Sequence, residues 1–355
     1  MAAWTWAVPA LSSLLLLVAL ATGVGTLLVA LCAVALIGAV FSAVHHAEVV
    51  AHRVGEPFGT LVLALAVTVI EASLILSMIV AAPAEAAALP RDTLYAAVMI
   101  ICNGVVGVCV LVGGIAHREQ TFRVEGAGAG LAALITMSAL TLVLPGYTIT
   151  TPGGTYSEGQ LEFVAVVSAA LWAVFVFIQT VRHRDYFLPV ADAANPEAHA
   201  APPTLTRAWV SGGLLLVSLV AVVGLAKVLS PSIEHAVETV GAPRTVIGIV
   251  IAMLVLLPET IAAVRAALAN RLQTSMNLAI GSALASIGLT IPVVAAASVV
   301  FHLPLVLGLG PKDIVLLTVT FLVSAVTLGT GRTHMMQGAV HLVLFGTFLF
   351  LALVP

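Results

Sequence analysis

Residues 57–81 read PFGTLVLALAVTVIEASLILSMIVA, and the only charged side chain in this stretch is Glu71. A helix of this length is about 37 Å long, enough to cross the roughly 30 Å hydrocarbon core of a bilayer. The whole chain shows the same character, because 61% of its 355 residues are apolar and only 8% are charged. Soluble domains carry about a quarter charged residues. The sequence therefore predicts an all-α, polytopic membrane protein and excludes an ordinary soluble globule.

Similar apolar windows recur along the chain. They lie near 57–81, 93–115, 128–145, 160–181, 208–229, 245–264, 276–300, 313–329 and 336–354. The run 10–44 is too long for one span, and its Gly23 and Gly25 pair predicts a division into two. This division gives about eleven transmembrane helices, whereas a single tilted helix over 10–44 would give ten.

The loops between these spans differ in their content of Lys and Arg. Loops at 45–58, 116–126, 182–207, 265–275 and 330–335 hold nine of the thirteen Lys and Arg residues, and the alternate loops hold four. Because cytoplasmic loops are enriched in positive charge, the first set is predicted to be cytoplasmic. With eleven spans, the N-terminus is then cytoplasmic and the C-terminus is outside. Residues 1–10 lack the basic residues of a cleaved signal peptide, so the first span is expected to be retained.

The two halves of the chain share a sequence pattern before their central spans. Glu48 is followed seven residues later by Gly55, and Glu234 is followed seven residues later by Gly241. A chance match in a chain rich in Gly and Val is the alternative. With five spans in each half, the second copy would enter the membrane from the opposite side, as in transporters built from inverted repeats.

This organisation predicts four segments. They are an extra N-terminal transmembrane helix over 1–24, a first five-helix repeat over 25–182, a cytoplasmic linker over 183–207 and a second five-helix repeat over 208–355. The linker is rich in Pro, Ala and small polar residues, a composition typical of flexible connections.

Glu71 and Glu259 are the acids that lie near the middle of predicted spans. A carboxylate at that depth costs at least a few kcal/mol, so it must be protonated, paired or exposed to a wet cavity. Burial favours the neutral carboxyl group, whereas a nearby cation favours the charged group. Protons and a cation would then compete for the same two side chains, which predicts an antiporter. The alternative is a pair of neutral acids hydrogen-bonded to packed helices.

Other oxygen donors are predicted to complete this metal site, because Ca²⁺ prefers several carboxylate, carbonyl and hydroxyl ligands. Thr68 lies three residues before Glu71 and shares its helix face. Asn103 and Ser282 occupy matching places in the next span of each half. For the serine, close helix packing is an equally strong interpretation.

Polar residues also gather at the predicted cytoplasmic entrance of the first half, at His45, His46, Glu48, His52 and Glu56. They could deliver cations or protons to the site or respond to their concentration. The alternative is an ordinary solvated helix end. The chain shows no basic block of the kind that binds nucleic acid and no HExxH or GxSxG motif. We therefore expect that the protein has no nucleic-acid partner and no resident cofactor, and that it is not an enzyme.

Five passages carry a resemblance to known proteins. They are HHAEVVAHRVGEPFGTLVLALAVTVIEASLI at 45–75, RDTLYAAVMIICNGVVG at 91–107, IQTVRHRDYF at 178–187, LLPETIAAVRAALANRLQTSMNLAIGSALASIGLTIPVV at 256–294 and TLGTGRT at 327–333. With them the chain resembles the cation/Ca²⁺ exchanger superfamily, and within it the bacterial calcium/sodium–proton antiporters of the ChaA type. The resemblance implies ten core helices in two inverted five-helix repeats plus an extra N-terminal helix.

The resemblance also implies that Glu71 and Glu259 bind the exchanged cation, with Asn103 and Ser282 in the neighbouring helix motifs. We expect an antiporter of the bacterial inner membrane that exports Ca²⁺ in exchange for H⁺, with Na⁺ and K⁺ as further candidate substrates. Na⁺/Ca²⁺ exchange or monovalent cation/proton exchange on the same fold is the alternative. An intramembrane enzyme or a channel is less favoured.

Overall fold

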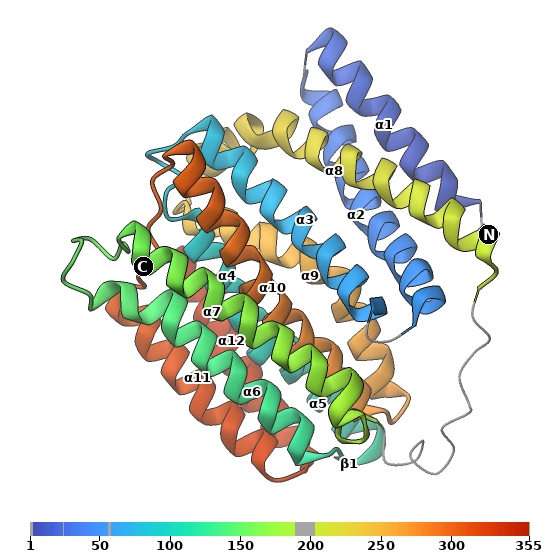
Figure 1. Ribbon diagram of the computed structural model, residues 1–355, viewed down its shortest axis with the longest axis vertical. Helices are drawn as coiled ribbons and strands as arrows, with labels where there is room; N and C mark the ends of the chain where they lie inside the picture. Colours follow the sequence, from blue (N-terminus) through green and yellow to red (C-terminus); the bar gives the residue numbers. More distant parts are fainter. Residues whose placement is uncertain (1–2, 24, 56–57, 189–202, 355) are drawn as a thin grey trace. The chain divides into compact units, whose positions relative to one another are not determined.

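The computed structural model describes residues 3–23, 25–55, 58–188 and 203–354, and it is nearly all helical (Figure 1). The helices are α1 (Trp4–Thr22), α2 (Thr26–Val54), α3 (Phe58–Ala81), α4 (Leu89–Met99), α5 (Val106–His117), α6 (Val124–Ser138), α7 (Glu158–Phe177), α8 (Leu205–Val240), α9 (Thr245–Leu268), α10 (Leu272–Phe301), α11 (Pro311–Gly329) and α12 (Met335–Leu353). Ile100–Val105, Ala139–Val143 and Ile178–Arg182 form π-helical turns, and Leu144–Gly146 and Arg184–Phe187 form short 3-10 turns. Two strands, β1 (Glu119–Thr121) and β2 (Arg332–His334), complete the set.

Among the described residues, eleven helical segments are long and apolar enough to cross a membrane, which confirms the predicted number. One of them, Leu89–His117, joins α4 and α5 through a π-helical turn. The predicted division of the first apolar run is also confirmed, since α1 ends at Thr22 and α2 begins at Thr26. Gly23 adopts a φ of +75°, a backbone conformation that residues with a Cβ atom rarely adopt. Its N–H donates to Ala19 O.

Two helices extend further than the sequence predicted. The loop expected over 45–58 is helical as far as Val54, and α8 continues to Val240 instead of ending near 229. Both helices end at a glycine in the left-handed region, Gly55 with φ +74° and Gly241 with φ +70°. Their polar last turns were interpreted as loops, but polarity alone does not end a helix, whereas a left-handed glycine does. The matched ends support the predicted repeats, which stay a prediction.

Part of the predicted linker over 183–207 lies outside the described residues, as do Glu56 and Pro57 of the first-half motif. In the described part, a 3-10 turn occupies Arg184–Phe187 and α8 already begins at Leu205.

The chain forms two compact units. The first contains Met1–Leu89 and Ala200–Val255, and the second contains Pro90–His199 and Leu256–Pro355. Each unit therefore combines helices from both halves of the sequence, and α9 contributes to both units. These units are defined by contacts between helices, whereas the four predicted segments follow the order of the sequence. The division into two repeats and a linker therefore stays a prediction.

In the first unit, α2 packs against α1, α3 and α8 (Figure 1). Small residues let the backbones of α2 and α8 approach closely, since Ala39 and Ala43 on α2 and Ala221 on α8 are completely buried. Ser218 Oγ donates to Ser42 Oγ at 3.3 Å between the same two helices. Small-residue packing with interhelical hydrogen bonds is the usual means of joining helices where lipid removes the hydrophobic driving force.

In the second unit, α12 packs along α5 through glycines. A Cβ atom added at Gly338 would lie 2.5 Å from Leu111 N and 2.8 Å from Gly107 O, so no side chain fits there without moving α5. The strands join the neighbouring ends of the same two helices. β1 pairs antiparallel with β2, with Gln120 opposite Thr333.

Candidate cation site

The first predicted ligand pair lies on α3, in the first unit. Glu71 is the fourteenth of the 24 residues of this helix, and only 1% of its surface is exposed. Thr68 is buried on the same helix face, and its hydroxyl donates to Ala64 O at 2.8 Å. Because that bond uses the hydroxyl proton, the lone pairs of Thr68 Oγ1 remain the part of the group that a cation could use. Both residues are therefore buried on the same helix, and their role as cation ligands stays a prediction.

Glu259 is the fifteenth of the 24 residues of α9, and its side chain is half-buried. Pro258 directly precedes it and has no N–H to donate, so the carbonyl of Leu254 loses its usual helical partner. Such freed carbonyls inside a membrane are found where another group or a wet cavity satisfies them. Glu259 belongs to the second unit and Glu71 to the first. That their carboxylates meet stays a prediction.

Asn103 is completely buried within the π-helical turn Ile100–Val105 of the second unit. Its Nδ2 donates to Thr320 Oγ1 on α11 at 2.9 Å, and its Oδ1 lies 3.2 Å from His341 Nδ1 on α12. His341 Nε2 in turn lies 3.1 Å from Thr327 Oγ1. A π-helical turn inside an α-helix is an uncommon feature that is frequent at functional sites. The amide of Asn103 is thus held by a buried chain of polar side chains.

Three members of this hydrogen-bonded network were not predicted from the sequence, namely Thr320, Thr327 and His341. All three are buried, and the first two lie in the span of α11. The signal was present, because a histidine within the apolar run of α12 needs polar partners. Which partners it finds depends on three helices packing together, and periodicity does not report that.

Ser282 is half-buried on α10, also in the second unit. Ser286 and Thr290 follow it at intervals of four residues, so the three hydroxyls form one polar stripe along the helix. Ser286 and Thr290 are buried. Thr290 is a further candidate oxygen ligand that was not predicted, although its i, i+4 spacing from Ser286 is a signal in the sequence.

The histidine cluster lies on α2 and packs partly against the extra N-terminal helix. His46 Nε2 lies 2.7 Å from Thr5 O, and the His45 ring lies 5.0 Å from the Trp4 ring between centroids. A pocket of about 400 Å³ opens beside them, lined by His45, Glu48, Val49, His52, Pro203 and Arg207. Two of the predicted entrance residues therefore hold α1 on α2.

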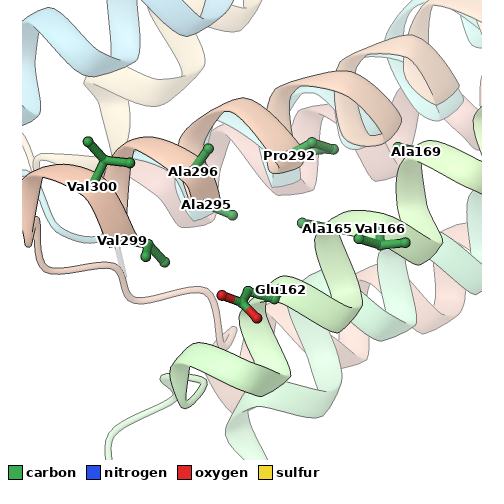
Figure 2. Close-up of a pocket in the computed structure, with 9 residues that line it drawn as sticks. All are labelled: Glu162, Ala165, Val166, Ala169, Pro292, Ala295, Ala296, Val299 and Val300. Carbon is green, nitrogen blue, oxygen red and sulfur yellow. The ribbon is translucent and has the colours of Figure 1, made fainter.

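A second hollow lies between α7 and α10 in the second unit (Figure 2). It has a volume of about 390 Å³ and is lined by alanines, valines and Pro292, with Glu162 near the start of α7 as its one charged residue. None of the predicted ligands lines it. Its lining is suited to apolar chains, and cation coordination has no support there.

The model of the sodium/calcium exchanger protein family matches residues 24–181 and 210–354, which cover both halves of the chain. The chain belongs to the sodium/calcium exchanger protein family. Members of this family are transporters, so this exchanger protein is a transporter, as the sequence predicted in place of an enzyme. It is a multi-pass membrane protein.

Two relatives cover nearly the whole of this exchanger protein. The y4hA protein of Sinorhizobium fredii is 46% identical over 99% of this chain and 96% of its own length. The sodium-potassium/proton antiporter ChaA of Escherichia coli is 36% identical over 89% of this chain and 86% of its own. The solved structure of YfkE has a TM-score of 0.75 at 17% identity, covering 99% of this chain and all of that one. The likeness to YfkE shows that the fold is shared.

Proposed function

We propose that this protein is a secondary active antiporter that exports Ca²⁺ in exchange for H⁺. The observation that carries the proposal is a glutamate near the middle of a central span in each half, Glu71 on α3 and Glu259 on α9, in a chain of the exchanger family. Two carboxylates balance the charge of one Ca²⁺ ion or of two protons. The two kinds of substrate would therefore replace each other at a single site.

In the proposed cycle, both carboxylates bind the cation while the site is open to the cytoplasm. Thr68, Asn103 and Ser282 add neutral oxygens, which suits a hard cation. A change of access then exposes the site to the other side, where protons displace the cation. Alternating access of this kind is the usual mode of transporters built from inverted repeats.

The transported cation distinguishes two candidate functions. The relative ChaA of E. coli is a sodium-potassium/proton antiporter, whereas YfkE is a Ca²⁺/H⁺ antiporter. Exchange of Na⁺ or K⁺ for protons is therefore the second candidate function. A glutamate near the middle of a central span in each half fits both functions, because a monovalent cation leaves one carboxylate to be protonated.

Purified protein in proteoliposomes will distinguish these functions. We expect an imposed pH gradient to drive uptake of radiolabelled Ca²⁺ in the absence of Na⁺, with proton movement recorded in parallel by a pH-sensitive dye. Faster exchange of Na⁺ or K⁺ than of Ca²⁺ would favour the second candidate. Ca²⁺ uptake that needs a Na⁺ gradient and moves no protons would contradict both.

We further propose that the N-terminus is cytoplasmic, the C-terminus is outside and the protein resides in the inner membrane of a bacterium. The imbalance of nine to four in Lys and Arg between alternate loops supports this orientation. The three natural cysteines are free and buried, so they leave a low background for cysteine labelling.

The orientation can be tested with two surface positions at opposite ends of spans. Glu119 precedes α6 and is predicted to be cytoplasmic, and Glu158 begins α7 and is predicted to be outside; both are exposed. We expect a membrane-impermeant maleimide to label Glu158→Cys in intact spheroplasts and Glu119→Cys only in inverted vesicles. The reverse pattern would contradict the assignment.

A further inference from the structure

The buried histidine of α12 has no place in the cycle described above. His341 is completely buried, and its ring nitrogens lie 3.2 Å from Asn103 Oδ1 and 3.1 Å from Thr327 Oγ1, with a further hydrogen bond to the backbone of Cys102. An imidazole buried in the membrane region of a protein is costly, so an ionisable residue there is a functional candidate by default. One of the residues that His341 contacts, Asn103, is a proposed cation ligand.

The hydrogen-bonding chemistry fixes the direction of these contacts. An amide oxygen only accepts hydrogen bonds, so His341 Nδ1 carries the proton and donates it to Asn103 Oδ1. In the neutral ring the other nitrogen is then an acceptor, and it receives the Thr327 hydroxyl. Asn103 Nδ2 donates to Thr320 Oγ1 at 2.9 Å. The amide is therefore held at both ends, and the second lone pair of Oδ1 keeps one defined direction.

The backbone around Asn103 is shaped to receive the imidazole. A Cβ atom at Gly107, one turn after Asn103, would lie 3.0 Å from the His341 Cβ, and one at Gly104 would lie 3.3 Å from the Phe345 ring. These glycines let α12 approach closely enough for the histidine to reach the amide. The small residues thus have a packing role that serves a particular hydrogen bond.

We propose that His341 is a positioning residue of the cation site, which acts by fixing the orientation of the Asn103 amide. The proposal rests on the proposed function, since it takes Asn103 as a ligand. A ligand oxygen that rotates freely must be ordered when the cation binds, and this ordering weakens binding. Loss of the histidine contact is therefore expected to raise the KM for the cation more than it lowers kcat.

Two isosteric substitutions separate the two contacts of the ring. The amide nitrogen of an Asn side chain falls near the place of Nδ1, and that of a Gln side chain falls near the place of Nε2. His341→Asn therefore keeps a donor towards Asn103 and loses the contact with Thr327, whereas His341→Gln does the opposite. Both variants are neutral and polar, so they are matched in charge and chemistry.

The test is exchange in proteoliposomes, with whichever of Ca²⁺, Na⁺ or K⁺ the wild-type protein transports fastest. We expect KM within about twofold of wild type for His341→Asn and raised about fivefold or more for His341→Gln, with kcat changed less than KM. In an Asn103→Ala background, which itself raises KM, His341→Gln should raise KM no further, because the two residues act as one unit. Elution as a single peak in size-exclusion chromatography confirms that each variant is folded.

A wild-type KM in His341→Gln would overturn the proposal, and so would equal impairment of both isosteres, which would indicate a packing role. A wild-type KM in Asn103→Ala would also overturn it, because the residue that His341 positions would not be a ligand. Failure of the proposed function looks different, since the wild-type protein itself would then show no proton-driven uptake of any of the three cations.

Discussion

Proteoliposomes that contain Glu71→Gln are expected to lose proton-driven cation uptake, with an initial rate reduced at least about tenfold, to the level of empty liposomes. Gln keeps the size of the side chain but neither carries negative charge nor takes up a proton. A loss of even about 1.4 kcal/mol of cation binding corresponds to a factor of ten. Glu71 is almost completely buried near the middle of α3, so water is poorly placed to replace the lost ligand. Glu259→Gln is expected to have the same effect.

A matched control is available for this substitution. Glu162 is exposed near the start of α7 and borders the apolar hollow of Figure 2, which none of the predicted ligands lines. Glu162→Gln makes the same chemical change and should leave the uptake rate within about twofold of wild type, as surface substitutions usually do. Wild-type uptake by Glu71→Gln would remove that residue from the mechanism. Equal loss in Glu162→Gln would show that the assay responds to something other than the site.

Gly338→Ala is expected to lower the thermal stability of the detergent-solubilised protein strongly. The added Cβ would lie 2.5 Å from Leu111 N and 2.8 Å from Gly107 O, and both are backbone atoms that cannot rotate away. Overpacking of this kind typically costs about 1–3 kcal/mol. The displacement would separate α12 from α5 and so also lengthen the contact between His341 and Asn103. Thermal denaturation followed by size-exclusion chromatography measures the change.

Gly346 provides the control on the same helix. A Cβ at Gly346 meets no atom within 4 Å, so Gly346→Ala creates no clash. Replacing Gly by Ala inside a helix is favourable by up to about 1 kcal/mol, so the melting temperature should stay the same or rise. Equal melting temperatures for the two variants would contradict the close contact between α5 and α12.

The sequence predicted the spans well, because each needs only a run of apolar residues of sufficient length. It also placed the break at Gly23, because 35 residues exceed the thickness of a bilayer. It misplaced the ends of α2 and α8, whose polar last turns were counted as loops. The left-handed glycines at which these helices stop, Gly55 and Gly241, were noted as a repeated motif and not as helix ends.

The residues of the candidate site likewise fall into those that the sequence predicted and those that only the structure reveals. Glu71 and Glu259 could be found because a lone acid in an apolar span is a local signal. Asn103 was found by comparing the two halves, but its partners were not. Thr320 and His341 lie 217 and 238 residues further along the chain, and only the packing of three helices brings them to the amide. The π-helical turn that carries Asn103 has no sequence signature comparable to a capping residue.

The pairing of β1 with β2 has a mechanical consequence for any transport cycle. The strands tie the end of α5 to the start of α12, and the glycine contacts hold the two helices together along their length. Contacts at both places would limit sliding and bending between the two helices. The two helices would therefore move as one rigid unit. A displacement of the exposed β1–β2 pair would then be transmitted through α5 and α12 to the buried Asn103.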